Sequence, residues 1–197
     1  SGWTRRRSPN EVKETRATVL SMFPVLAERL DTPAADLSGG QQQMLALGMS
    51  LIARPRVLLI DELSLGLAPV IVGQLLPVVR RLADDGVAVI LVEQSVNVAL
   101  TVAERAYFME RGRIRFNGPT AELLDRPDLL RSVFLSSASV GDPSARRVAP
   151  LADPSLPPAL AVTSMSCSFG GIRAVDDVTL SAAPQEILGL IGPNGAG

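Results

Sequence analysis

Three short stretches of this chain combine small residues, acids and amides in patterns that suit phosphate chemistry. The first is Ser38-Gly39-Gly40-Gln41, which leads into an apolar pattern of helical period at 41–53. Residues with so little side chain let backbone N–H groups approach an anion, and the positive end of the helix dipole adds to the attraction. A serine before a helix is also an ordinary N-cap, so this stretch alone does not decide between the two interpretations.

The second stretch is an acidic pair, Asp61-Glu62, that ends the apolar run 57–60. Such a run is typical of a buried parallel strand, and ligands bind at the carboxyl ends of the strands in open α/β sheets. Asp61 could hold Mg²⁺ on nucleotide phosphates, and Glu62 could orient or deprotonate an attacking water. Taken alone, such acids can also simply cap a strand and solvate a loop.

The third stretch closes the chain after a predicted strand at 186–191. Its residues fit the first six positions of the phosphate loop G-x-x-x-x-G-K-[ST]: Gly192, Pro193, Asn194, Gly195, Ala196 and Gly197. The Lys that reaches the β- and γ-phosphates, and the hydroxyl that binds Mg²⁺, would come after Gly197. We therefore expect that this loop by itself does not hold ATP. Because the chain also lacks an initiator Met, we expect both ends to be cut.

The elements that must position these motifs alternate between helix and strand up to residue 138. We expect helices at 10–30 (interrupted at Pro24), 41–53, 70–83, 96–103, 120–124 and 127–134, strands at 57–60 and 87–92, and a hairpin of 106–109 with 114–116. This order predicts an α/β fold with a mostly parallel sheet, helical cover and an antiparallel edge. Five prolines within 139–158 predict an extended linker, and strands follow it at 159–168, 178–182 and 186–191.

The composition limits the functions that the chain can have. Hydrophobic residues make up 47% and charged residues 20%, which suits a globular protein. A net charge of −1 leaves no broad electrostatic footprint for nucleic acid. Cys167 is the only cysteine, so it has no internal disulfide partner and a reducing compartment is expected. No segment reaches the ~18 consecutive apolar residues of a membrane span, so any membrane association would go through a partner.

Together, the motifs resemble the ABC ATPase family over residues 10–138 and 159–197. Leu37–Gln41 looks like its signature and Asp61-Glu62 like its hydrolysis motif. Ser64–Leu67 looks like its D-loop, and Gln94 falls at its switch position. The resemblance implies a partial P-loop NTPase fold, with ATP and Mg²⁺ as cofactors.

In this family two cassettes pair head to tail around ATP, and the resemblance carries roles over to single residues. Glu62 and Gln94 would be catalytic and Asp61 would bind the metal. Phe169 lies 23 residues before Gly192, where the family places an aromatic that stacks on adenine. The remaining nucleotide contacts would come from Ser38, Gly39, Gly40, Gln41, Ser64, Gly66 and the six residues 192–197.

The subfamily can be narrowed to the ATPases of branched-chain amino acid importers. The segment 64–69 and Gln94 look like one of the two ATPases of that system, whereas 169–175 and 192–195 look like the other. We therefore expect the C-terminal part of a first cassette at 1–138, a linker at 139–158 and the N-terminal part of a second cassette at 159–197.

The implied partners are a second cassette, membrane permease subunits on the cytoplasmic face of the cell membrane and, indirectly, a substrate-binding protein. No nucleic acid is expected as a partner.

Several alternatives stay open at this point. Urea or amide importers share much of the pattern, a non-transport ABC protein is a second class, and an inactive fragment is a third. Gln94 stands where most members have His, Leu63 where they have Pro, and Met49 where many have Arg, which lowers the activity expected of the first cassette. We also hypothesise that residues 159–197 dock onto the first half and complete its sheet.

Overall fold

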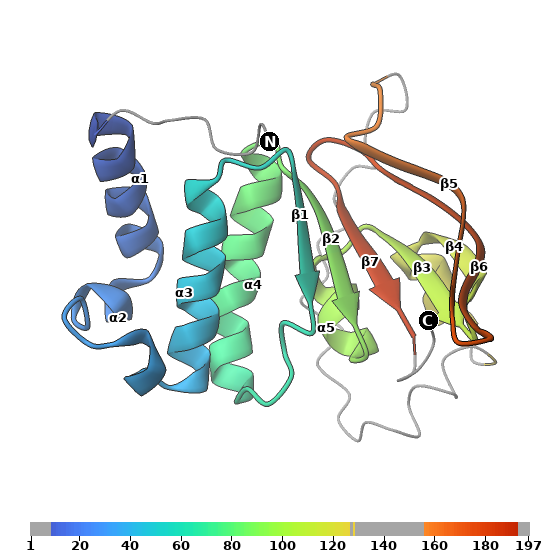
Figure 1. Ribbon diagram of the computed structural model, residues 1–197, viewed down its shortest axis with the longest axis horizontal. Helices are drawn as coiled ribbons and strands as arrows, with labels where there is room; N and C mark the ends of the chain where they lie inside the picture. The colour runs from blue at the N-terminus through green and yellow to red at the C-terminus, as the bar shows by residue number, and fades with distance from the viewer. Residues whose placement is uncertain (1–8, 127, 129–155, 193–197) are drawn as a thin grey trace.

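The computed structural model describes residues 9–126, 128 and 156–192. The helices are α1 (Pro9–Met22), α2 (Pro24–Ala27), a 3-10 turn η1 (Ala34–Asp36), α3 (Gly39–Ile52), α4 (Pro69–Asp84), α5 (Val96–Val102) and α6 (Thr120–Leu124). The strands are β1 (Val57–Asp61), β2 (Ala88–Glu93), β3 (Arg105–Glu110), β4 (Arg113–Pro119), β5 (Leu160–Phe169), β6 (Ile172–Ala182) and β7 (Ile187–Ile191). Figure 1 shows α1 to α4 on one side of the strands, whereas α5 lies close to β2 and β7.

The larger sheet has five strands in the order β1-β2-β7-β3-β4. The first four of these run parallel, and β4 pairs antiparallel with β3. The last strand in the sequence therefore lies in the middle of the sheet, with Glu93 of β2 opposite Ile191 on one side and Phe108 of β3 opposite Ile191 on the other. This arrangement confirms the hypothesis that the second segment docks onto the first half.

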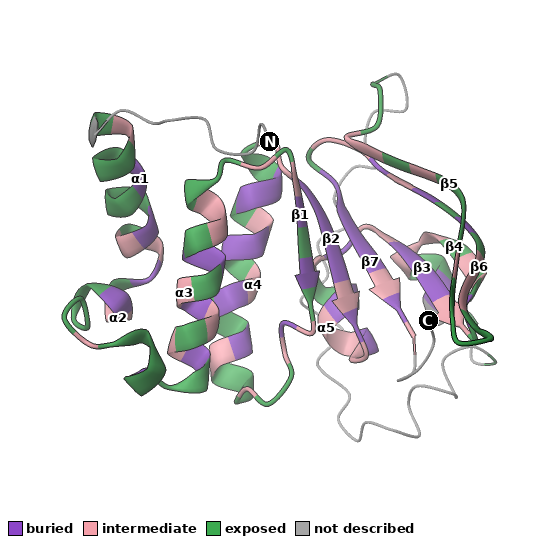
Figure 2. Cartoon of the chain, in the orientation of Figure 1, coloured by how far each residue is buried: buried purple, intermediate pink, exposed green. Residues whose placement is uncertain are grey.

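The two faces of the sheet have different covers. Alternate strand residues such as Leu58, Leu91 and Ile187 pack with α3 and α4 in one core cluster. The intervening strand residues, such as Ile90 and Leu188, point to the other face and pack against Val178 and other residues of the β5–β6 sheet. Figure 2 shows that burial runs along β2 and β7, whereas β5 is largely exposed. The apolar runs predicted as buried strands thus form the centre of the fold.

Two tight turns built on positive φ angles hold the β5–β6 sheet in place. Gly170 (φ 52) and Gly171 (φ 90) join β5 to β6, and Arg111 (φ 52) with Gly112 (φ 75) join β3 to β4. Asp176 N–H donates to the Gly112 carbonyl at 2.8 Å. An added Cβ on Gly112 would lie 2.5 Å from the Ala174 carbonyl oxygen, so only glycine allows this approach.

The structure changes some of the predicted boundaries. β6 begins at Ile172 rather than at 178, because the two-glycine turn lets pairing start directly at Phe169–Ile172. Cys167 in β5 is half-buried and not part of the core, since β5 is largely exposed to solvent. The helix predicted at 127–134 lies outside the described residues apart from Asp128, as does the linker 139–158 apart from 156–158. In the part of the chain that the structure describes, no helix is long and apolar enough to cross a membrane.

Candidate functional site

The glycine-serine motif forms the beginning of α3. Ser38 is the N-cap: its hydroxyl accepts from Gln41 N–H at 3.4 Å, and its own N–H donates to Gln41 Oε1 at 3.0 Å. This reciprocal capping box satisfies two backbone donors within the chain. The N-cap interpretation is therefore confirmed, and it leaves other N–H groups of the first turn free to meet an anion.

The two glycines of this motif serve different purposes. Nothing lies within 4 Å of a Cβ added to Gly39, so this side of the helix start is open. A Cβ added to Gly40 would lie 2.8 Å from Ile71 Cγ2, so Gly40 lets the first turn of α4 pack directly against α3. The start of α3 thus presents one open face and one packed face.

Asp61 and Glu62 lie where β1 ends and a tight turn begins. Asp61 is exposed, and no ion pair to it is found among the described residues. Glu62 N–H donates to the Val92 carbonyl at 2.9 Å, and Glu62 has φ 50, an unfavourable angle for a residue with a side chain. Gln94 Nε2 donates a hydrogen bond to Glu62 Oε1. The structure therefore brings together the two residues that the sequence predicted as catalytic.

A single exposed carboxylate such as that of Asp61 fits Mg²⁺ in a nucleotide site, where phosphates and waters supply the other ligands. Within the described ranges, no cluster of three or more His, Cys, Asp or Glu side chains forms a metal cage.

Ser64 follows in the same turn and contacts a residue that sequence analysis had not singled out. Ser64 N–H donates to Glu93 Oε1 at 3.0 Å, and Ser64 Oγ donates to Glu93 Oε2 at 2.9 Å. Glu93 is 3% exposed, and this burial raises the pKa of its carboxyl group, against the lowering by the Ser64 hydrogen bonds. The sequence offers one signal for a special role of Glu93, namely an acid at the end of an otherwise apolar strand.

Gly192 follows β7 directly, at the same sheet edge as Asp61 and Glu93. The parallel register places Asp61 opposite Val92 and Glu93 opposite Ile191, so these strand ends meet. The rest of the predicted phosphate loop, residues 193–197, lies outside the described residues. Gly66, the other predicted contact in the D-loop-like turn, has φ 70 and open space around it.

Phe169 is the last residue of β5, beside the Gly170–Gly171 turn, and 69% of it is exposed. An aromatic ring left this open is not a core residue of the described fold, which favours a role in contact with something else. The β5–β6 turn and the end of β7 lie at the same end of the molecule (Figure 1).

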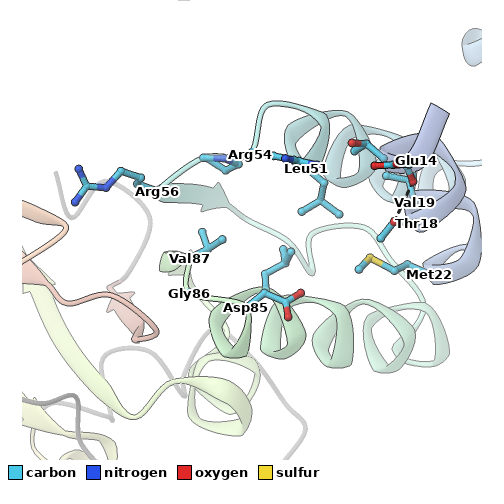
Figure 3. Close-up of a pocket in the computed structure, with 13 residues that line it drawn as sticks. Glu14, Thr18, Val19, Met22, Leu51, Arg54, Arg56, Asp85, Gly86 and Val87 are labelled. Atoms are coloured by element: carbon cyan, nitrogen blue, oxygen red, sulfur yellow. Dashed lines mark hydrogen bonds between the residues drawn. The ribbon is translucent and has the colours of Figure 1, made fainter. Parts of the chain in front are cut away.

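A cavity of about 540 Å³ lies at the other end of the sheet, between α1, the end of α3 and the end of α4. Its lining includes the charged residues Glu14, Arg54, Arg56 and Asp85 and apolar side chains such as Leu51 (Figure 3). Arg56 directly precedes β1 whereas Asp61 ends it, which separates the two places by roughly 15 Å along the strand. The predicted site therefore does not use this cavity.

Several known proteins are similar to this chain in sequence. Residues 6–64 match the family described as ABC transporter. The high-affinity branched-chain amino acid transport ATP-binding protein BraG of Pseudomonas aeruginosa is 50% identical over 117 residues, which are 59% of this chain and 50% of the relative. A putative ABC transporter ATP-binding protein of Methanosarcina acetivorans is 27% identical over all 197 residues, which are 37% of the relative. Relatives named for the transport of other amino acids match as well.

Solved structures give the same fold. MJ1267, an ATP-binding cassette of an ABC transporter, superposes with a TM-score of 0.57 at 23% identity, over 68% of this chain and 53% of that one. The fold is thus a partial ABC ATPase fold, as predicted. The chain spans about half the length of the BraG relative, and over the matched parts it is similar to ATP-binding proteins of ABC transporters.

Proposed function

We propose that this chain forms part of the ATP-hydrolysing component of an ABC importer for branched-chain amino acids. The observation that carries the proposal is the common sheet edge at which Asp61, Glu62, Gln94 and Gly192 meet. The acids, the amide and the start of a phosphate loop follow three parallel strands and lie at one edge of the sheet. They do so although β7 begins only at Ile187, far along the chain from the end of β2 at Glu93. Ligands bind at this end of the strands in open α/β sheets.

In this proposal Glu62 orients or deprotonates the attacking water. Its carboxylate is held by Gln94 Nε2, and its backbone by the Val92 carbonyl. Gln94 can hydrogen-bond but cannot take up a proton near neutral pH, so Glu62 is the only candidate base of this pair. Mg²⁺, held by Asp61 when nucleotide is present, would neutralise charge on the phosphates.

The start of α3 fits a contact with the ATP of a paired cassette. Among the described residues, no hydrogen bond joins Ser38–Gln41 to the acids at the end of β1. The open face at Gly39 is therefore available to a second cassette, which is the head-to-tail arrangement that the resemblance implies. Exposed Leu65 and Val70, in the turn and in the first turn of α4, would add apolar area to such an interface.

We also propose that residues 1–138 and 159–197 derive from two cassettes in tandem, joined by the linker 139–158. The Methanosarcina acetivorans relative supports this, because it matches the chain from end to end, linker included, and is more than twice its length. Transport of branched-chain amino acids, permease partners and a place at the cytoplasmic face of the membrane rest on the BraG similarity and on the resemblance of 64–69.

The test is Mg-ATP binding and turnover by this chain, beside the same chain extended past Gly197 through the Lys and Ser/Thr that complete the loop motif. We expect only the extended chain to bind ATP tightly and hydrolyse it, because the Lys and the hydroxyl supply the main phosphate and metal contacts. Glu62→Gln in the extended chain should lower kcat by at least about 100-fold while ATP binding persists.

Glu28→Gln is the matched control, since Glu28 is exposed on the chain after α2, away from the acids of β1. Its turnover should equal that of the unsubstituted chain. Tight ATP binding by the 197-residue chain alone would contradict the proposed role of the loop. Full turnover by Glu62→Gln would contradict the assignment of the base.

A further inference from the structure

Glu93 is a buried acid that forms no ion pair within the described part of the chain. It is 3% exposed at the end of β2, and no Lys or Arg of the described residues forms an ion pair with it. The other buried glutamate of the described chain, Glu186, is paired with Arg105 at 2.7 Å. Burying an unpaired carboxylate is costly, so Glu93 is not the residue that stability alone would favour at this position.

The carboxylate of Glu93 accepts hydrogen bonds from the neighbouring turn and also from the backbone of Ser95. Both of its carboxylate oxygens accept from Ser64, one from the N–H at 3.0 Å and one from the hydroxyl at 2.9 Å. Its neighbours hold the same turn: the Val92 carbonyl accepts from Glu62 N–H, and Gln94 donates to the Glu62 carboxylate. Val92 and Glu93 of β2, with Gln94 directly after the strand, thus hold Glu62 and Ser64 from one side.

The turn needs such support because its own geometry is strained. Glu62 has φ 50, which costs free energy in a residue with a Cβ and persists only where surrounding contacts impose it. Within the turn, the only backbone hydrogen bonds found in the described structure are Leu65 N–H to the Glu62 carbonyl and Leu67 N–H to the Ser64 carbonyl, both at 3.2 Å. Leu63, 1% exposed, anchors the turn in the core.

Glu93 also faces the strand that leads into the phosphate loop. It pairs in register with Ile191 of β7, and Gly192 follows at once. Glu93 therefore binds the turn that carries Glu62 through its carboxylate, while its backbone lies opposite Ile191, the last residue of β7.

We propose that Glu93 is a positioning residue, which fixes the turn Glu62–Leu67 on the end of β2 and so sets the place of Glu62 and Ser64 relative to the loop that begins at Gly192. The consequence for hydrolysis rests on the function proposed above, whereas the consequence for the turn does not. If Glu93 positions the turn and does not stabilise the fold, its replacement should leave the free energy of unfolding unchanged but make the turn less ordered.

The test compares Glu93→Met with the unsubstituted chain. Methionine is similar in length and fills the site, but it offers the Ser64 donors no carboxylate. We expect amide hydrogen exchange at Leu65 and Leu67 to accelerate at least about ten-fold, because the turn loses two charge-assisted hydrogen bonds. The midpoint of urea unfolding at pH 7 should not fall, because the cost of burying the carboxylate disappears with it. Exchange at Gly86, in a turn remote from the site, should not change.

Two further variants distinguish a positioning role of Glu93 from a contribution to the stability of the fold. Glu93→Gln keeps one acceptor for Ser64 N–H, so it should restore most of the slow exchange at Leu65 and Leu67. Glu186→Met removes the other buried glutamate and leaves Arg105 without its partner. It should therefore lower the unfolding midpoint, while exchange at Leu65 and Leu67 stays slow as long as the chain is folded.

In the chain extended past Gly197, Glu93→Met should lower kcat for ATP about ten-fold and leave KM within about two-fold. The reason is that the substitution displaces the Glu62 carboxylate, which acts on the attacking water and not on nucleotide binding. Unchanged exchange at Leu65 and Leu67, or a uniform acceleration that includes Gly86 together with a lower unfolding midpoint, overturns the proposal. An unchanged kcat overturns it as well. If the unsubstituted extended chain does not hydrolyse ATP, the proposed function fails, and the exchange rates alone decide whether Glu93 holds the turn.

Discussion

Replacing Ile187 by Ala tests the central feature of the fold, the insertion of β7 between β2 and β3. Ile187 is 0% exposed, lies opposite Val89, and packs in the core that α3 and α4 share with the sheet. Its N–H donates to Glu104 Oε2 at 2.9 Å, which fixes the start of the strand. The side chain is therefore enclosed by core residues of the described structure.

The expected loss is about 3–5 kcal/mol in the free energy of unfolding. Truncation of buried Ile to Ala costs roughly 2–5 kcal/mol, and the upper part of that range applies where surrounding strands and helices cannot collapse into the space. Ile172→Ala is the matched control, because it makes the same substitution in the same segment at a side chain that is 74% exposed. It should cost less than about 1 kcal/mol, mostly through strand propensity.

Urea unfolding followed by far-UV circular dichroism measures both values. The slope of unfolding free energy against urea should be the same in both variants, because the whole chain unfolds as one unit when β7 is part of the central sheet. Losses of similar, small size at Ile187 and Ile172 would refute the placement of β7. Two separate transitions, with only the second one affected, would refute it as well.

Three further predictions concern packing, capping and pH. Gly48→Ala should lower the unfolding midpoint, because its Cβ would lie 2.5 Å from Val19 Cγ1, and the double variant with Val19→Ala should recover part of the loss in the same urea assay. Ser38→Ala removes the hydroxyl of the capping box and should lower the free energy of unfolding by about 1 kcal/mol, whereas an unchanged value would mean that the cap contributes nothing. The Arg113 hydrogen bond lowers the pKa of Asp176 from its usual 3.8, so the stabilisation by this pair is present above that pH and is lost as the pH falls below it. The stability difference between the unsubstituted chain and Asp176→Asn should accordingly shrink between pH 5 and pH 2, and a difference independent of pH would contradict this assignment.

Local sequence signals identified most of the elements and the chemistry-bearing residues. Apolar runs of four to six residues predicted β1 and β2 because a strand buried on both faces has nowhere to place a polar side chain. The Ser38 cap and the glycines beside it predicted where α3 begins, because capping depends on neighbours within one turn. The pairing of Asp61 with Glu62 marked a strand end for the same local reason.

What the sequence alone determined is therefore the set of residues and the elements that carry them: an apolar strand before Asp61-Glu62, a capped helix after Ser38, and a strand before Gly192. The tertiary structure alone decided the partners, namely that β7 enters the sheet beside β2, that Gln94 reaches Glu62, and that Glu93 holds Ser64. The physical reason is range. Helix periodicity, caps and turns depend on residues a few positions apart, whereas sheet order and the pairing of a buried carboxylate depend on which surfaces fit together once the whole core is packed.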